Sequence, residues 1–236
     1  MLLYSAAKLM KQSCAQMNYL DWQKDSYAKV MTAQMSATGE LIKDWEAFKG
    51  STDAQLKGNE FAEESSKSDY KEMRGSFIFD SKTLGDTIQI NYCFDEIRSL
   101  PSKNIVIEHK SVILRDDEDV TTKEYLTDCV TQVGFYKALH EFSNKQYRTA
   151  RFYEEAGWPV HTLNLSFKPI EFLLHIGDKW YKINIKEPKE ILRYYITKIK
   201  ASKDFQKSRA FDLKYQEKEW NYFKKFITRR VMKEPQ

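Results

Sequence analysis

The sequence contains little cysteine and no long apolar run. Its three cysteines lie far apart among 236 residues and form no C-x-x-C pair: Cys14, Cys93 and Cys129. They are too few and too scattered for a disulfide framework, a zinc knuckle or a four-cysteine iron–sulfur cluster. No stretch reaches the roughly 20 apolar residues of a membrane-spanning helix, and the opening residues lack the apolar core of a signal peptide. We therefore expect a cytoplasmic protein with no membrane partner and no iron–sulfur cluster.

Charge is nearly balanced over the whole chain but unevenly distributed along it. Lys and Arg number 38 and Asp and Glu number 34, which gives a net charge of +4. From Tyr195 to Gln236, twelve basic residues stand against five acidic ones, so the preceding residues are net acidic. A basic flank beside an acidic centre is suited to holding a polyanion such as a nucleic acid.

The length and composition predict one folded domain. Aromatic residues make up 14% and charged residues 31% of the chain, which is typical of a folded protein rather than a disordered one. We expect a single domain over residues 1–236, with a helical region at 1–57, a core at 58–186 and basic helices at 187–236.

The stretch 86–112 predicts two β-strands joined by a turn. Turn-forming residues separate the strands: Ser99, Pro101, Ser102 and Asn104. The β-branched run at 105–107 predicts that the second strand is buried, and Glu108 and Lys110 follow this run directly. Side chains two apart on a strand share a face, so these two project together while His109 points the other way.

An antiparallel pairing of these strands brings Asp95 close to Glu108. Buried charges are costly unless they are paired or bound to a metal, and two converging carboxylates suit a hard divalent cation such as Mg²⁺ or Mn²⁺. Asp80 is a rival ligand, but it ends a strand before a turn, where aspartate is common for local reasons. Glu96 is expected to face the opposite side of its strand and to be exposed.

These residues resemble the core motif of the PD-(D/E)-x-K nuclease superfamily. Asp95 is followed after twelve residues by Glu108-His109-Lys110, and Phe94 stands where many members have proline. The resemblance implies an α/β fold with a central mixed sheet flanked by helices, similar to restriction endonucleases, with N- and C-terminal helical extensions. It also implies that Asp95, Glu108 and the main-chain carbonyl of His109 bind Mg²⁺ or Mn²⁺, while Lys110 orients or helps to deprotonate the attacking water.

A second motif is similar to the Q-x-x-x-Y signature of the RecB-like exonuclease branch. It comprises Gln132-Val133-Gly134-Phe135-Tyr136, within a helix expected at 123–142. Residues four apart share one face of a helix, so Gln132 and Tyr136 can both reach toward the end of the Glu108 strand. The resemblance implies that they position the scissile nucleotide or the metal-bound groups.

The helix expected at 53–73 is a candidate source of a third acidic ligand. In RecB-like enzymes the helix before the sheet often bears a histidine four residues after a glycine, but Ala62 occupies that position after Gly58. Glu60, Glu63 or Glu64 are the candidate replacements, and a solvated acidic face is the alternative. We expect Glu63, or else Glu60, to complete the metal site.

Hydrophobic periodicity predicts the remaining elements. Two helices are expected before residue 49, and further strands at 75–80, 146–154, 162–167, 170–176 and 179–186. A helix is expected to begin at Pro188, where proline suits a first turn, and a final helix is expected at 213–232. The other histidines have no metal-like spacing and are expected to be structural or on the surface: His140, His161 and His175.

The expected final helix mixes cations with aromatic residues. Its basic residues are Lys214, Lys218, Lys224, Lys225, Arg229 and Arg230. Interleaved cations and aromatic rings bind single-stranded nucleic acids, because the cations follow the phosphates and the bases stack on the rings. The alternative is an amphipathic helix whose aromatic residues pack inward, which leaves only the basic face for phosphate contact.

The hypothesis that follows is a divalent-metal-dependent DNA nuclease, most similar to RecB-like exonucleases. The resemblance implies DNA as the partner, single-stranded or at duplex ends, in the company of recombination, replication or defence proteins. Two alternatives use the same residues. One is a nucleic-acid-binding or assembly protein that does not cleave, and the other is a structure-specific endonuclease.

Overall fold

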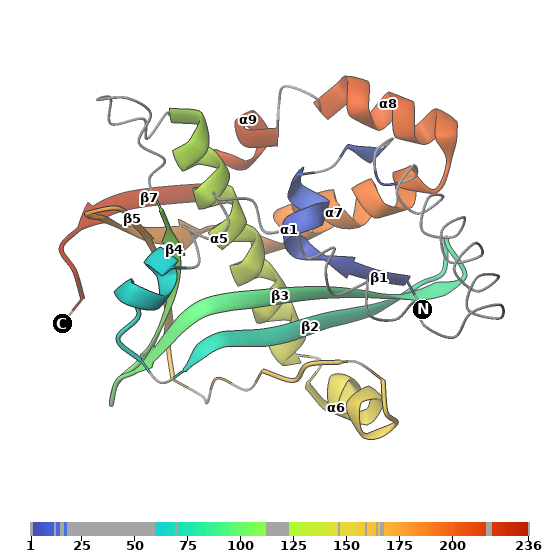
Figure 1. Ribbon diagram of the computed structural model, residues 1–236. Coiled ribbons are helices and arrows are strands. Elements are labelled where there is room, and N and C mark those ends of the chain that lie inside the picture. Colours follow the sequence, from blue (N-terminus) through green and yellow to red (C-terminus); the bar gives the residue numbers. More distant parts are fainter. Residues whose placement is uncertain are drawn as a thin grey trace, which may run out of the picture.

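The computed structural model shows an α/β fold in which helices flank a mixed, open β-sheet (Figure 1). It describes residues 2–11, 13–14, 17, 60–68, 70–111, 123–145, 147–158, 160–163, 165, 168–215 and 219–235. The predicted fold class is confirmed at this level. In the described part of the chain, no helix has the length and hydropathy needed to cross a membrane.

Seven strands of the described chain form the sheet, and β3 (Asp86–Ser99) is the longest. The others are β1 Leu2–Ser5, β2 Lys71–Ser81, β4 Asn104–Lys110, β5 Ile170–Ile176, β6 Lys179–Ile185 and β7 Ile227–Met232. They follow the order β1-β3-β4-β5-β6-β7, and β2 also pairs with β3. Strands β1 and β4 run parallel to β3 and β5 respectively, whereas the other neighbours are antiparallel.

The alternation of side chains along β3 changes phase near its middle. From Ile88 to Phe94, the even-numbered residues of β3 enter the main core, but farther along it is the odd-numbered Ile97 that does so. The pairing of β2 with β3 is interrupted at the same place, where Glu72 would face Asp95 and adopts a φ of 49°. A positive φ is uncommon for a residue with a side chain, and an irregularity of this kind re-aims the strand.

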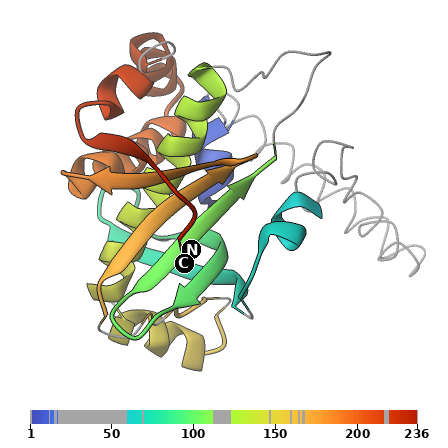
Figure 2. The same cartoon turned by 90° about the vertical axis from the view of Figure 1, so that its left-hand side faces the viewer.

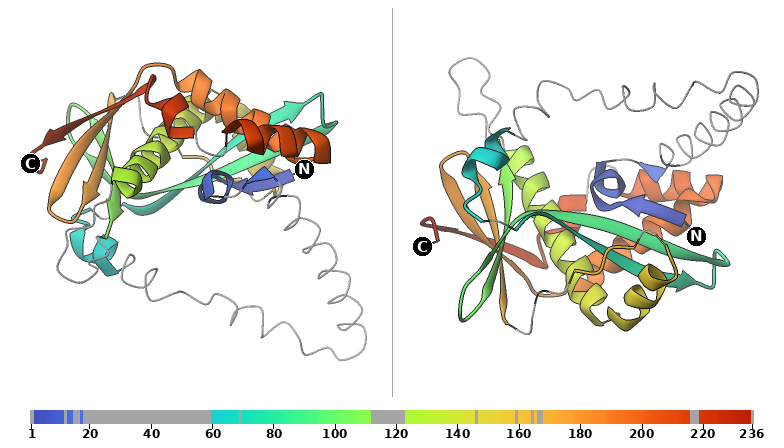
Figure 3. Two further views of the ribbon diagram at one scale, coloured as in Figure 1. Left: turned by 90° about the horizontal axis from the view of Figure 1, so that it is seen from above. Right: turned by 60° about the horizontal axis from the view of Figure 1, so that its bottom comes forward.

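Helix α5 (Lys123–Lys145) crosses one face of the sheet between β4 and β5 (Figure 3). Parallel strands need such a crossover connection, so the β4–α5–β5 order follows from their pairing. Val130, Val133 and Leu139 of α5 are buried against the sheet. Gly134 allows close approach, because a Cβ there would lie 2.6 Å from Cδ1 of Ile227 on β7.

Helix α7 (Pro188–Ser202) packs on α5, and the Phe135 and Tyr195 rings stack at 3.8 Å between them. The remaining labelled helices are α1 Ala6–Lys11, α6 Tyr147–Glu155, α8 Phe205–Tyr215 and α9 Glu219–Phe223. Helix α6 lies on the opposite face of the sheet from α5, where its Tyr153 packs on Ile78 of β2. The C-terminal residues also lie over a face that α5 leaves open (Figure 2).

Several predicted elements are confirmed, among them the hairpin of β3 and β4, the helix α5, the hairpin of β5 and β6, and the helix that starts at Pro188. The strand expected at 146–154 is wrong, because this stretch forms α6, whose Tyr153 contact suits a helix lying on a sheet. Residues 162, 163 and 165 are outside any strand. The single helix expected at 213–232 is also wrong, since its β-branched end forms β7.

Two predictions near the N-terminus need correction. Residues 2–5 form β1 rather than part of a helix, because they pair with β3. The helix expected at 53–73 is helical over its described residues 60–65, but residues 71–73 belong to β2. The second helix expected before residue 49, together with Gly58, lies outside the described residues.

Candidate active site

Glu108 lies at the centre of the candidate site, on the face of β4 that α5 covers. Its Oε1 accepts hydrogen bonds from Lys110 Nζ at 2.5 Å and from Gln132 Nε2 at 2.7 Å. The same Gln132 nitrogen lies 3.0 Å from the hydroxyl of Tyr136. The structure thus brings together four residues from the two motifs, as the i,i+2 spacing on a strand and the i,i+4 spacing on a helix predict.

The second carboxylate, Asp95, approaches the same strand from β3. Its Oδ2 accepts a hydrogen bond from the main-chain N–H of His109 at 2.8 Å. The pairing of β3 with β4 runs up to Glu96 and Ile107, so Asp95 faces Glu108 if this register is continued by one residue. The rival Asp80 lies elsewhere on β2, where it accepts a hydrogen bond from Thr87.

The electrostatics of the site follow from burial and from the proximity of its charges. Burial of Glu108, and next the charge of Asp95, raise its pKa to about 7 against the pull of Lys110. Burial acts to lower the pKa of Lys110, but the charges of Glu108 and Asp95 outweigh it and the pKa is raised. Burial and then the charge of Glu108 also raise the pKa of the Tyr136 hydroxyl. Lys110 is therefore an ammonium that faces two carboxyl groups.

One oxygen of this site has no protein partner. Glu108 Oε2 is buried and, among the described residues, no donor reaches it, although unpaired buried carboxylate oxygens are costly. Together with Asp95 it supplies oxygen donors of the kind that Mg²⁺ and Mn²⁺ prefer. The donor set therefore fits a hard divalent cation.

In the part of the chain that the structure describes, no third acidic side chain lies beside Glu108 and Asp95. Glu60, Glu63 and Glu64 are exposed, and no three described His, Cys, Asp or Glu side chains gather closely enough to hold a metal ion. The residue of this segment that does approach β4 is Phe61, whose ring lies 6.5 Å from that of His109.

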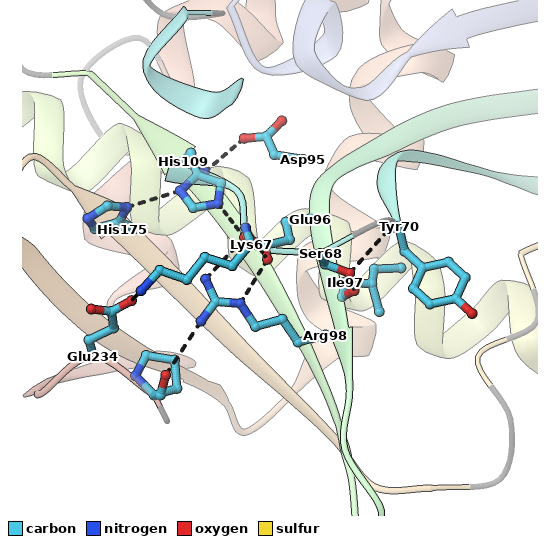
Figure 4. A network of polar contacts seen from close by, with 11 residues as sticks. Lys67, Ser68, Tyr70, Asp95, Glu96, Ile97, Arg98, His109, His175 and Glu234 are labelled. Carbon is cyan, nitrogen blue, oxygen red and sulfur yellow. Dashed lines mark hydrogen bonds and ion pairs between the residues drawn. The ribbon is translucent and has the colours of Figure 1, made fainter. Parts of the chain in front are cut away.

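Glu96 is buried on the opposite face of the sheet, so the prediction of an exposed side chain is wrong (Figure 4). Its Oε2 lies 2.8 Å from His109 Nε2, and its Oε1 accepts hydrogen bonds from Arg98 Nε at 2.8 Å and Lys67 N at 3.0 Å. These donors outweigh the effect of burial and lower the pKa of Glu96 to about 2. The carboxylate is therefore ionised and fully paired.

The polar network extends from Glu96 to the neighbouring strands and to the C-terminus. His109 Nδ1 lies 3.0 Å from Nδ1 of His175, whose ring stacks at 4.0 Å on that of Trp180. Burial and then His109 lower the pKa of His175 to about 4. The Arg98 guanidinium reaches the carbonyl of Pro235 at 3.4 Å, and Lys67 pairs with Glu234 of the same terminal segment.

The sequence prediction missed this network, although a signal for it was present. Glu96 and Arg98 are two residues apart on β3, so their side chains face the same side of the sheet. On the partner strand β4, His109 follows Glu108 and therefore faces the opposite side from Glu108. An acidic and a basic residue two apart on one strand, opposite a histidine of the partner strand, are expected to form a polar cluster on one face of the sheet. Of the histidines expected to be structural or on the surface, His140 is buried beside Tyr92 and His175 is buried in this network.

The predicted nucleic-acid-binding cations do not lie on one helix. Lys214 is on α8, Lys224 and Lys225 are in the turn after α9, and Arg229 and Arg230 are on the edge strand β7. All five are exposed, and in the described chain Lys224, Lys225, Arg229 and Arg230 form no ion pair with a carboxylate. Lys218 lies outside the described residues.

Comparisons with known proteins give no family for this chain. No family model matches it, and no curated protein matches it. A solved structure, "Crystal structure of SSO0001", is similar at 16% sequence identity with a TM-score of 0.37, over 84% of this chain and 75% of that one. A similarity of this degree identifies neither a family nor a function.

Proposed function

We propose that this protein is a divalent-metal-dependent deoxyribonuclease that hydrolyses phosphodiester bonds, with DNA ends as substrate in the manner of RecB-like exonucleases. The observation that carries the proposal is the Glu108 carboxylate. One of its oxygens is held by Lys110 and Gln132, and the other is buried without a partner while Asp95 lies nearby. A buried carboxyl group beside a second acidic group is costly for stability, and such costs are typical of functional sites.

Glu108, Asp95 and the main-chain carbonyl of His109 are the residues that would hold Mg²⁺ or Mn²⁺. A bound ion of this kind supplies a water of lowered pKa and neutralises charge on the phosphate. The protein's contribution is to keep the two carboxyl groups in place. Asp95 is held by the His109 N–H and Glu108 by its two side-chain donors, so neither needs to reorganise during the reaction.

Lys110 acts in this proposal as a fixed cation. Because the neighbouring carboxyl groups raise its pKa, it remains protonated and can donate hydrogen bonds to the attacking water and to the phosphate oxygens. Its side chain keeps 21% of its surface exposed, whereas that of Glu108 keeps 4%. The ammonium therefore lies on the open side of the site, where a substrate would enter.

Gln132 and Tyr136 position groups around Glu108. The amide nitrogen of Gln132 has two hydrogens, which serve Glu108 and the oxygen of Tyr136. The hydroxyl hydrogen of Tyr136 is then directed away from Gln132. In the described contacts it has no acceptor, so it can be donated to a nucleotide.

The edge of the sheet next to this site supports DNA binding. Lys110, Ile176 and Lys179 are successive partners across β4, β5 and β6. On β7, Arg230 and Arg229 pair with Lys182 and Ile183, three and four residues along β6 from Lys179. Neighbouring strands are about 4.8 Å apart and successive residues of a strand about 3.3 Å apart, so these cations lie within a few nucleotides of Glu108. Exposed cations at such spacing can follow a phosphate backbone.

The test is incubation of the full chain with end-labelled linear DNA and closed circular DNA, in Mg²⁺, Mn²⁺ or EDTA. We expect metal-dependent loss from free ends, and its abolition in Glu108→Ala and Lys110→Ala proteins. Lys182→Gln is the matched control, because it removes a partly exposed cation paired to Glu171 two strands away. Cutting of closed circles would favour an endonuclease, and an active Glu108→Ala protein would contradict the assignment.

A nucleic-acid-binding protein without cleavage is the second candidate. It is favoured by the exposed positions of Glu60 and Glu63, which leave two acidic side chains at the described site. DNA binding without metal-dependent degradation in the same assay would support this role.

A further inference from the structure

The backbone pairing between the two strands of the candidate site stops just before the site. The ladder between β3 and β4 runs from Ser99 and Asn104 to Glu96 and Ile107. Beyond that pair no ladder contact joins β3 to β4 in the described chain, although Asp95 and Glu108 must stay at a fixed separation to share a cation. Some other contact has to set this separation.

His109 makes two contacts that can do so. Its main-chain N–H donates to Asp95 at 2.8 Å, and its Nε2 lies 2.8 Å from Glu96, so the carboxylate accepts a hydrogen bond from that nitrogen. One residue of β4 thus holds two consecutive carboxylates of β3, one on each face of the sheet. Consecutive residues of a strand face opposite sides of the sheet, and the phase change of β3 puts Asp95 on the side of Glu108 and Glu96 on the side of the His109 ring.

The side-chain contact is rigid because both partners are fully enclosed. The His109 and Glu96 side chains have no exposed surface. His175 lies against the second nitrogen of the His109 ring, and Arg98 occupies the remaining positions on Glu96. These groups belong to β3, β4 and β5, and Figure 4 shows them pointing toward one another. A buried ionic cluster seldom adds stability over apolar packing, and its best-attested use is to fix a register.

We infer that the Glu96–His109 pair is a positioning device that sets the gap between Asp95 and Glu108 and thereby the cation that fits between them. Mg²⁺ and Mn²⁺ require a small site of fixed geometry, whereas Ca²⁺ accepts longer and more variable distances. A gap that is held rigidly therefore selects the smaller ions. This inference rests on the proposed metal site for its consequence, but the positioning itself can be measured without metal.

The first experiment measures exchange of the His109 amide hydrogen in the full chain by NMR. Glu96→Leu removes the acceptor, and His109→Phe keeps the ring packing and the main-chain N–H. We expect each variant to lose at least tenfold in protection at His109 while the Val106 amide, which lies within the ladder, is unchanged. Glu171→Leu is the matched control, because it removes a carboxylate that also binds two cations on the same sheet.

Protection at His109 that survives in Glu96→Leu and His109→Phe would overturn the inference, and equal losses at His109 and Val106 would show a merely structural role. If one variant does not fold, the other decides the question.

Calorimetry with Mn²⁺ and Ca²⁺ then tests the consequence for ion selection. We expect Mn²⁺ binding to weaken by 10–100-fold and Ca²⁺ binding by less, and an unchanged ratio of the two affinities would contradict ion selection. A wild-type chain that binds neither ion would overturn the proposed function and leave the amide result to judge the positioning.

Discussion

The side-chain amide of Gln132 lies 2.7 Å from the carboxylate of Glu108, although 24 residues separate them in the chain. The contact joins α5 to the end of β4, and the parallel pairing of β4 with β5 is what obliges the helix to cross there. The topology of the sheet therefore delivers the Q-x-x-x-Y residues to the E-x-K residues. Substitutions in α5 and in the sheet can test the functional consequences of this contact.

Tyr136→Phe should lower the rate of DNA cleavage by about tenfold. The change removes one hydrogen bond to the substrate, and a bond of this kind is worth about 1.5 kcal/mol. Tyr92→Phe is the control, because Tyr92 is a buried tyrosine bonded to Ser143 at 2.8 Å and not to the site. Both variants should lose comparable stability in urea, and equal losses of activity would argue against the role of Tyr136.

Gly75→Ala should destabilise the fold by about 1–3 kcal/mol. A Cβ at this position of β2 would lie 2.4 Å from Cζ and Oη of Tyr92. That ring is buried and hydrogen-bonded to Ser143 and His140, so it has little room to move. Urea unfolding measures the loss, and a Tyr92→Leu background should reduce it. Additive effects of the two changes would show that the clash is relieved elsewhere.

Stability should fall on mild acidification because of His140. Burial lowers its pKa from 6.5 to about 4, so the folded state holds this ring neutral while the unfolded state takes up a proton. The contribution is fully present above pH 6.5 and is lost as the pH falls toward 4, for a total of about 3 kcal/mol. His175 acts with the same sign. A His140→Gln protein should be less stable at pH 7 but should show a flatter dependence of unfolding free energy between pH 7 and 4.5.

Replacing Arg229 and Arg230 with Gln should weaken DNA binding and its dependence on salt. Each phosphate contact contributes a slope of about 0.9 for duplex DNA and about 0.7 for single strands, so the double change should reduce the slope by up to about 2. Fluorescence anisotropy at several KCl concentrations measures it. The control is Lys82→Gln with Arg151→Gln, which removes two exposed cations in the β2–β3 turn and on α6. An equal effect of the two pairs would mean that the edge strand has no special part.

The contacts around Glu108 follow from local signals in the sequence, whereas the expected third acidic ligand and the single basic helix do not appear in the described chain. The run at 105–107 and the turn before it are local signals, and they were sufficient to find β4, its partner and the face that Glu108 shares with Lys110. The Q-x-x-x-Y spacing likewise depends only on the period of a helix. Contacts of this kind can be read because each is set within one element or one hairpin.

The errors have a different physical origin. The residues of β7 follow helical ones and gain their strand conformation by pairing with β6, a contact that is remote in sequence. Glu96 was expected to be exposed, as a charged residue on the outer face of a strand usually is. It is buried because Arg98 and a histidine from another strand pair with its carboxylate. The helix expected at 53–73 shows the same limit, since its last residues are drawn into β2. In each case a tertiary contact overrides the local preference.

The irregularity opposite Glu72 has a consequence for how this segment can change. Because the alternation of β3 changes phase there, Asp95 and not Glu96 lies on the side of Glu108, and Glu96 faces the His109 ring on the other side. Removing or adding one amino acid between Phe94 and Ile97 would exchange their surroundings and turn the Asp95 side chain away from Glu108. A substitution at this bend changes one side chain and leaves the facing of its neighbours in place, whereas an insertion or deletion reverses the facing of both acids at once.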